Sequence, residues 1–177
     1  GLKTLDLGVN KLRDISPLID LTNLTILELH HNELRDISPL TNLNNLTVLE
    51  LYQNFKITDL SPLTNLTNLT ALGLQHNEIR DINPLANLTN LTWLNLRSNQ
   101  LSDISPLANL TNLEVLHLWR NKLSEVSLLA NLTSLTHLDL GFNPLSNIGT
   151  LADLTNLTYL SSEGTQISDI SSLLNLT

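Results

Sequence analysis

Residues 91–99 read LTWLNLRSN, and their pattern of Leu-x-x-Leu-x-Leu-x-x-Asn decides the fold. The same pattern begins at six further positions, Leu2, Leu24, Leu46, Leu69, Leu113 and Leu135, and an eighth copy at Leu157 has Ser162 and Thr165 in place of the last leucine and the asparagine. Successive copies lie 22 residues apart, except for one interval of 23 residues that carries an insertion near Phe55 and Lys56. Eight copies at a nearly fixed spacing indicate a repeat protein, in which each unit packs against its two neighbours.

Each unit combines a short strand with a tighter return segment. In the unit that starts at Leu24, the apolar residues Leu27 and Leu29 alternate with outward positions, which is the period of a half-buried strand. Asn32 then turns the chain, and its stacked equivalents predict a ladder of side-chain hydrogen bonds that fails at Thr165. Apolar residues at a spacing of three follow, which predicts a 3₁₀ or short helical return: Leu34, Ile37, Leu40 and Leu43.

Polar residues mark the start of each return segment. In the pair Ser38-Pro39 we expect the serine to act as the helix N-cap and the proline to occupy the first helical position. An acidic residue two positions earlier is expected to accept hydrogen bonds from free N–H groups there. This position holds seven of the 17 acids: Asp14, Asp36, Asp59, Asp81, Asp103, Glu125 and Asp169.

Composition narrows the classes of function. The 177 residues include 47 leucines and 23 asparagines but only six aromatic residues. The formal net charge of -8 argues against a basic nucleic-acid-binding surface. Because seven acids belong to the repeat, however, this charge says little about a protein partner. There is no cysteine, and no apolar run approaches the roughly 18 residues that span a bilayer.

Stacking such units predicts an α/β repeat solenoid with a parallel sheet on one face. Short 3₁₀, helical or irregular returns are expected on the other face, and because they are wider than the strands, they bend the stack into a horseshoe. The repeats fill residues 1–177, so we expect one domain of about eight 22-residue units. The chain begins at Gly1 without capping sequences at either end, which favours a piece of a longer protein.

The whole unit resembles a known family. Its consensus adds Asp-Ile-Ser-Pro-Leu and Asn-Leu-Thr-Asn-Leu to the strand pattern, is clearest in residues 91–112, and is similar to the internalin (SDS22-like) class of bacterial leucine-rich repeats. The resemblance extends over all 177 residues. It implies a right-handed, curved solenoid that binds protein partners, often on a bacterial surface.

The rare residues gather on the predicted concave face, which comprises the third, fifth and seventh positions of each unit with the eighth at its rim. Five of the six aromatic residues and all five histidines fall in these columns, and Phe55 lies beside them. Exposed Trp, Tyr and Arg on a rigid surface are typical of interface anchors, although strands favour aromatic residues without any ligand. We predict that a partner contacts Glu28, Glu50, Tyr52, Gln75, Trp93, Asn95, Arg97, His117, Trp119, His137, Asp139 and Tyr159.

Two local features of this face each allow two interpretations. Ala71 and Gly73 predict a dent in the middle of the face, although Gly73 also relieves crowding. The acidic column of Asp6, Glu28 and Glu50 either splays into water or receives a cation.

His117, His137 and Asp139 have the chemistry of a zinc site. We expect no metal there, because surface histidines more often make ordinary contacts. The pair His30-His31 is a weaker candidate, since neighbouring side chains of a strand point to opposite sides.

These observations favour a non-catalytic, monomeric protein-binding domain on a bacterial cell surface or in secreted form, without a cofactor. The open sheet offers no closed pocket for catalysis, and no phosphate loop or nucleophile motif is present in the sequence. An intracellular regulatory scaffold, such as a phosphatase-targeting subunit, and a structural spacer are the alternatives. A partner that is nucleic acid, or insertion into a membrane, is not expected.

Overall fold

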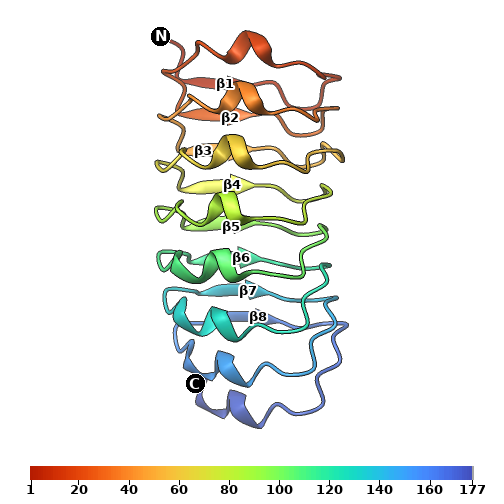
Figure 1. Ribbon diagram of the computed structural model, residues 1–177. Coiled ribbons are helices and arrows are strands. Elements are labelled where there is room, and N and C mark those ends of the chain that lie inside the picture. Colours follow the sequence, from red (N-terminus) through yellow and green to blue (C-terminus); the bar gives the residue numbers. More distant parts are fainter. Residues whose placement is uncertain (177) are drawn as a thin grey trace.

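A computed structural model describes residues 1–176 and contains one parallel sheet whose strand order follows the chain. Every strand is three residues long and pairs in register with the next unit. The strands are stacked in sequence order along the molecule (Figure 1). Their bounds are β1 Thr4–Asp6, β2 Ile26–Glu28, β3 Val48–Glu50, β4 Ala71–Gly73, β5 Trp93–Asn95, β6 Val115–His117, β7 His137–Asp139 and β8 Tyr159–Ser161.

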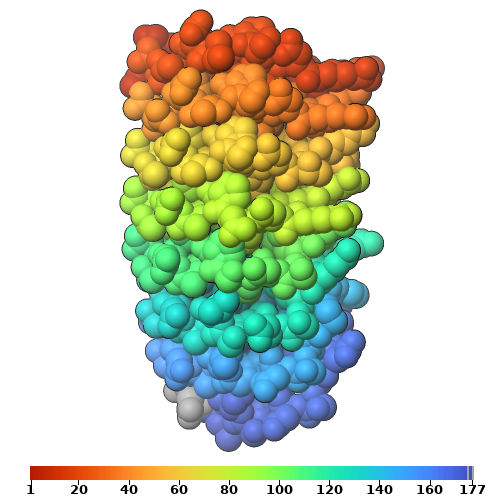
Figure 2. Space-filling model, viewed as in Figure 1, coloured from red at the N-terminus to blue at the C-terminus, as the bar shows by residue number. Residues whose placement is uncertain are grey.

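Short 3₁₀-helices form the second layer, and in Figure 1 they lie over the strands. The space-filling view shows the units as successive layers in chain order (Figure 2). This arrangement confirms the predicted leucine-rich-repeat horseshoe, while the expected domain end at Thr177 lies outside the described residues. The helices are η1 Ser16–Leu18, η2 Ser38–Leu40, η3 Ser61–Leu63, η4 Asn83–Leu85, η5 Ser105–Asn109, η6 Ser127–Asn131, η7 Gly149–Asp153 and η8 Ser171–Asn175. None of the helices in this part of the chain has the length and hydropathy needed to cross a bilayer.

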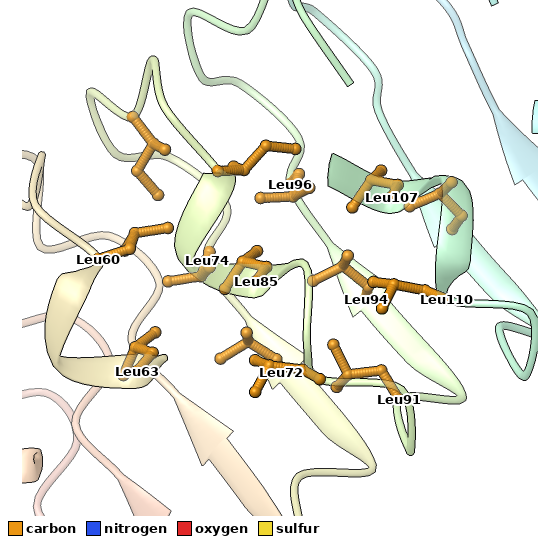
Figure 3. Packing of buried hydrophobic residues seen from close by; sticks show 14 of the residues in the cluster. Leu60, Leu63, Leu72, Leu74, Leu85, Leu91, Leu94, Leu96, Leu107 and Leu110 are labelled. Carbon is orange, nitrogen blue, oxygen red and sulfur yellow. The ribbon is translucent and has the colours of Figure 1, made fainter. Parts of the chain in front are cut away.

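The core between the two layers is built from aliphatic side chains. Leu72 and Leu74 of one unit pack beside Leu94 and Leu96 of the next, and return-segment leucines such as Leu85 close the space from the other side (Figure 3). In the described residues, the buried hydrophobic side chains are all Leu, Ile or Val. One unit cannot cover its own leucines, so burial depends on stacking.

A ladder of buried asparagines joins the units at the turns after the strands. The Asn99 amide donates to the carbonyl oxygens of Leu96 in its own unit and Leu74 in the preceding unit, at 3.1 and 3.0 Å. Its Oδ1 accepts from the Ile79 N–H at 3.1 Å. Equivalent bonds to both units are made by Asn32, Asn54, Asn121 and Asn143. The predicted ladder is therefore confirmed.

Two positions modify this ladder. At Asn77, Oδ1 is buried without a hydrogen-bond partner, because the one-residue insertion displaces the N–H that other units supply. Where the ladder was expected to fail, the Thr165 hydroxyl donates to the Ser162 carbonyl oxygen at 2.8 Å, so the turn keeps a bond within its own unit.

The predicted serine N-cap is wrong. The N-cap residue of η2 is Ile37, and no side chain caps this helix. Instead, the Asp36 carboxylate accepts a 2.8 Å hydrogen bond from the Ser38 N–H. The expectation for the acidic position is thus confirmed here and at five further returns, at Asp14, Asp59, Asp81, Asp103 and Asp169. Asn147 accepts the same bond from Gly149 in η7, at 2.7 Å.

The eighth residue of every unit adopts a left-handed backbone conformation. The values of φ lie between 52° and 66°, and only the last of these eight residues, Gly164, is a glycine. Left-handed backbone costs a non-glycine residue about 1–2 kcal/mol. The alternation of inward and outward side chains along the strand therefore ends at the eighth residue. The direction of the rim side chains follows from this left-handed conformation.

Candidate functional site

The strand register brings the predicted columns side by side. In the third column Trp93 pairs with Val115, and in the fifth column His117 lies between Asn95 and Asp139. The side chains between these positions, such as Leu94 and Leu116, point into the core and are buried. The candidate residues therefore belong to one continuous surface, as the period predicts.

The acidic column does not splay uniformly into water. Glu50 is half-buried and leans over Gly73, where its Oε2 occupies the space that a Cβ atom would need. That oxygen is buried and has no hydrogen-bond partner. Burial, assisted by the neighbouring charge of Glu28, raises the pKa of Glu50 to about 7. Asp6 is exposed, so the carboxylate at one end of the column is solvated, whereas that of Glu50 at the other end is partly desolvated.

The predicted dent at Ala71 and Gly73 is consequently filled. Gly73 has no Cβ, which permits the close approach of the Glu50 carboxyl group. The same device recurs at Gly8, covered by the His30 ring, and at Gly141, covered by Trp119. Each of these glycines provides room for a large side chain of the adjacent strand.

An aromatic cluster lies beside the acidic column. The His30 and Tyr52 rings stack at 4.6 Å with an interplanar angle of 10°, and His31 meets Tyr52 edge-on at 5.4 Å. The expectation that His30 and His31 point to opposite sides is wrong, because His31 has φ of 52° and its ring lies 5.7 Å from that of His30. His30 Nδ1 is 3.8 Å from Glu28 Oε2.

The other half of the face is organised around Trp119. The Arg97 guanidinium lies 5.1 Å from the Trp119 ring centroid, and the two side chains form a cation–π pair. Arg120 approaches the same ring at 5.9 Å, and Phe142 packs edge-on at 5.2 Å. Arg97 Nε also lies 4.0 Å from Asp139 Oδ2, so the cation joins the aromatic ring to a carboxylate.

Two candidate residues are buried and support the backbone. Asn95 Oδ1 accepts from the Arg97 N–H at 3.1 Å, and Asp139 Oδ1 accepts from the Gly141 N–H at 3.2 Å. Both side chains fix the course of the chain after their strands. This structural role was not predicted from the sequence, although the fifth column holds Asp6, Asn95 and Asp139.

Two contacts between a histidine and an aromatic ring complete this half of the face. Trp93 and His117 meet at 6.2 Å in an edge arrangement, and His137 stacks on Tyr159 at 5.9 Å. His117 Nδ1 is buried without a hydrogen-bond partner. Burial lowers the pKa of His117, although the Asp139 charge acts in the opposite direction.

The side chains that lie close enough together to hold a metal ion differ from the zinc-site candidates named from the sequence. Among residues 1–176, the only three His, Cys, Asp or Glu side chains whose ligand atoms all lie within 4.8 Å of one another are Asp6, Glu28 and His30. His117, His137 and Asp139 do not form such a group in this part of the chain.

Buried polar atoms without partners concentrate on the concave face. In the described residues there are six such atoms, and five belong to concave or rim positions: His30 Nδ1, Glu50 Oε2, Gln75 Oε1, Ser98 Oγ and His117 Nδ1. Burial of an unpaired polar group is unfavourable. This surface therefore retains hydrogen-bonding capacity that the fold itself does not use.

Comparison with known proteins matches the chain to leucine-rich-repeat models, each of two repeat copies, at residues 1–42, 44–87, 89–131 and 111–154. The chain belongs to the leucine-rich-repeat family. A search of curated proteins found no match.

Solved structures place the leucine-rich repeats among those of the internalin type. Internalin C2 of Listeria monocytogenes superposes with a TM-score of 0.95 at 40% identity, over 98% of this chain and 76% of that one. The internalin inlF of the same species gives 0.84 at 41% identity, over 96% of this chain and 56% of inlF. A leucine-rich-repeat protein of Leptospira interrogans gives 0.77 at 26% identity, over 99% of this chain and 52% of that one. The chain thus spans about half the length of two of these proteins and three quarters of the third. Repeats of this type form protein-interaction domains.

Proposed function

We propose that the chain is a non-catalytic recognition domain that binds a protein partner through its concave face. The observation that carries this proposal is the contrast in composition between the core and that face. The buried hydrophobic side chains of residues 1–176 are aliphatic, whereas Trp93, Trp119, Tyr52 and Tyr159 lie on the concave face. Anchors of this kind, held on a rigid sheet, supply most of the affinity in protein interfaces.

The internalin neighbours from Listeria support a surface-exposed or secreted bacterial location, with adhesion as the biological setting. The proposed contact surface comprises the twelve residues predicted from the sequence, and the protein is proposed to act as a monomer. Intact bacteria treated with an external protease test the location, because a surface protein is degraded while cytoplasmic proteins survive.

The binding face is tested with matched variants of the purified chain. Immobilised wild type, Trp119→Ala and Asn109→Ala are exposed to the same candidate partner proteins, and the retained proteins are compared. Asn109 lies in η5 on the return face and is exposed. A partner retained by wild type and Asn109→Ala but lost with Trp119→Ala supports the concave face. A partner lost only with return-face variants contradicts it.

A further inference from the structure

A hollow of about 340 Å³ opens at the β6–β8 end of the concave face. His117, Asp139 and Ser161, which are fifth-position residues of three adjacent strands, form its floor. His137 and Tyr159 line one side, and the other side is lined by Arg97, Trp119 and Glu163. This volume falls at the lower end of the roughly 300–1,000 Å³ that small-molecule sites occupy. The hollow therefore has the size for a small ligand.

Small residues in the repeat create this hollow. Ser161 keeps the floor low, and Gly141 gives the Trp119 ring room to lie over the backbone at the side of the hollow. The third and seventh positions are four residues apart, so the two sides stand about 13 Å apart at the Cα atoms. A flat ring can enter between them.

The sides offer aromatic surface. His137 and Tyr159 stack with an interplanar angle of 20°, and 49% of Tyr159 is exposed. On the opposite side the Trp119 ring carries the Arg97 guanidinium over it. Tyr159 therefore presents an accessible apolar ring, and Arg97 presents N–H donors.

The floor holds polar atoms that the fold leaves without full partners. The Asp139 side chain is only 10% exposed, and its Oδ1 is used by the Gly141 N–H. Its Oδ2 lies 4.0 Å from Arg97 Nε, which is too long for a hydrogen bond. The neighbouring His117 Nδ1 is buried and has no hydrogen-bond partner. Asp139 Oδ2 therefore gains from a ligand that brings a hydrogen-bond donor into the hollow.

The mixture of charges selects the chemistry of that ligand. Asp139 and Glu163 would favour an amine, but Arg97 beside them opposes a second cation. The two carboxylates oppose an acidic ligand for the same reason. A hydroxyl group can donate to Asp139 and accept from Arg97.

We propose that this hollow binds a neutral pyranose ring. One apolar face of the sugar packs on Tyr159, and its hydroxyl groups bond to Asp139, His117 and Arg97. Aromatic side chains serve this purpose because they combine a broad apolar face with polar neighbours. The hollow lies within the contact surface proposed above, but its floor is polar, whereas the central anchors of a protein interface require desolvated apolar pockets.

The test is an NMR titration of the 177-residue chain with methyl glycosides of glucose, galactose, mannose and N-acetylglucosamine. At least one is expected to shift the Trp119 indole N–H and the His137 ring signals in a saturable manner. Glucuronate and Nα-acetyl-lysine amide serve as acidic and cationic comparisons. The ring could come from a free sugar or from the end of a glycan, and disaccharides that carry the bound ring at the non-reducing end separate these two sources. If a disaccharide binds with the same affinity as the methyl glycoside, the ligand is the end of a glycan. If the disaccharide is excluded, the ligand is a free sugar.

Two variants make the test specific. Asp139→Asn removes the charge but keeps the backbone bond, since Asn95 makes the same bond in its own unit. Loss of a charge-assisted hydrogen bond is expected to weaken sugar binding by about tenfold or more. Tyr159→Leu is expected to produce a comparable loss. Phe55→Leu, at an exposed aromatic residue that neither lines the hollow nor belongs to the proposed contact surface, is the matched control and should bind as wild type does.

Thermal melting of each variant verifies that it is folded. Three results would overturn the proposal: no neutral glycoside shifts these signals, the lysine derivative saturates the hollow while the sugars do not, or folded Asp139→Asn and Tyr159→Leu bind a sugar normally. The second result would indicate a socket for a basic side chain.

Discussion

The return face and the concave face are made from the same 22-residue unit, yet they use their polar groups differently. On the return side, Asn90 and Asn112 donate their amides to Thr67 and Thr89 of the preceding units, at 2.8 Å in both cases. Most of the Asp residues there accept backbone N–H groups at the helix starts, as Asp103 does. On the concave face, by contrast, Glu50, Gln75 and His117 bury polar atoms that have no partner.

This difference distinguishes the side chains that hold the units together from those that are available to a partner. Where a polar side chain is consumed by the next unit, its role is to join units. Where a concave-face side chain buries a polar atom that stays unpaired, that atom contributes no hydrogen bond to the fold. The following predictions test that distinction, beginning with the change of largest expected effect.

Leu94→Ala should damage the scaffold most. Leu94 is fully buried between units, and its truncation should lower the free energy of unfolding by roughly 2–5 kcal/mol through lost transfer energy and a cavity. Urea denaturation followed by circular dichroism measures this. Partner binding by the remaining folded protein should be unchanged, and a selective loss of affinity would contradict the assignment.

Asn99→Ala should destabilise by about 2–4 kcal/mol, because it leaves the Ile79 N–H without a partner and removes one of the two amide donors to the Leu74 carbonyl oxygen. Asn77→Ala is the matched comparison. Asn77 Oδ1 already lacks a partner, so this change should cost about 1 kcal/mol less. Equal losses in urea denaturation would show that the insertion does not weaken the ladder.

Trp119→Ala should separate binding from stability. Its ring lies outside the core, so unfolding should change by at most about 1 kcal/mol. If the partner docks on the concave face, affinity should fall by about 2 kcal/mol or more, as for truncated aromatic anchors. Calorimetric titration with the identified partner measures this, and Arg97→Ala should behave similarly. Normal binding by both variants would exclude this half of the face.

Glu50→Gln should change the free energy of unfolding by a smaller amount that depends on pH. The pKa of Glu50 is raised to about 7 in the folded chain, so its charged form is disfavoured there. Between pH 4.5 and 7 the folded state holds more protons than the unfolded state, and stability falls as pH rises. After allowance for solvent screening, Glu50→Gln should therefore gain about 1–2 kcal/mol over wild type at pH 8.

Near pH 4 the Glu50→Gln difference should vanish, because Glu50 is then protonated in both states. Urea denaturation across this range, with Glu28→Gln as the comparison, provides the measurement. A difference between Glu50→Gln and wild type that does not depend on pH would argue against a desolvated carboxyl group.

The sequence determines the periodic part of this molecule well. Every strand begins at the same place in its unit. The repeat positions that Leu94 and Asn99 occupy were therefore enough to predict the core, the register of the strands and the asparagine ladder. The local details depend on neighbours that the period does not contain. Glu50 leans toward β4 while His30 leans toward β1, and each follows the nearest glycine.

Some errors had equally specific causes. The N-cap position falls on Ile37 because the Asp36 carboxylate has already engaged the Ser38 N–H. The left-handed φ of His31 ends the strand alternation before its side chain is placed. The hollow near Trp119 could not be predicted from the large residues, because its depth depends on the small side chain of Ser161 in the fifth column.

The direction of the inter-unit hydrogen bonds has a mechanical consequence. The bonds between strands, and those of the asparagine ladder, run along the stack, so tension applied along that axis loads the contacts of one unit boundary at a time. Each detached unit of 22 residues would release about 75 Å of extended chain. Under such a load the molecule should lengthen in steps, and the boundary at Asn77, which lacks one rung of the ladder, should be among the first to yield.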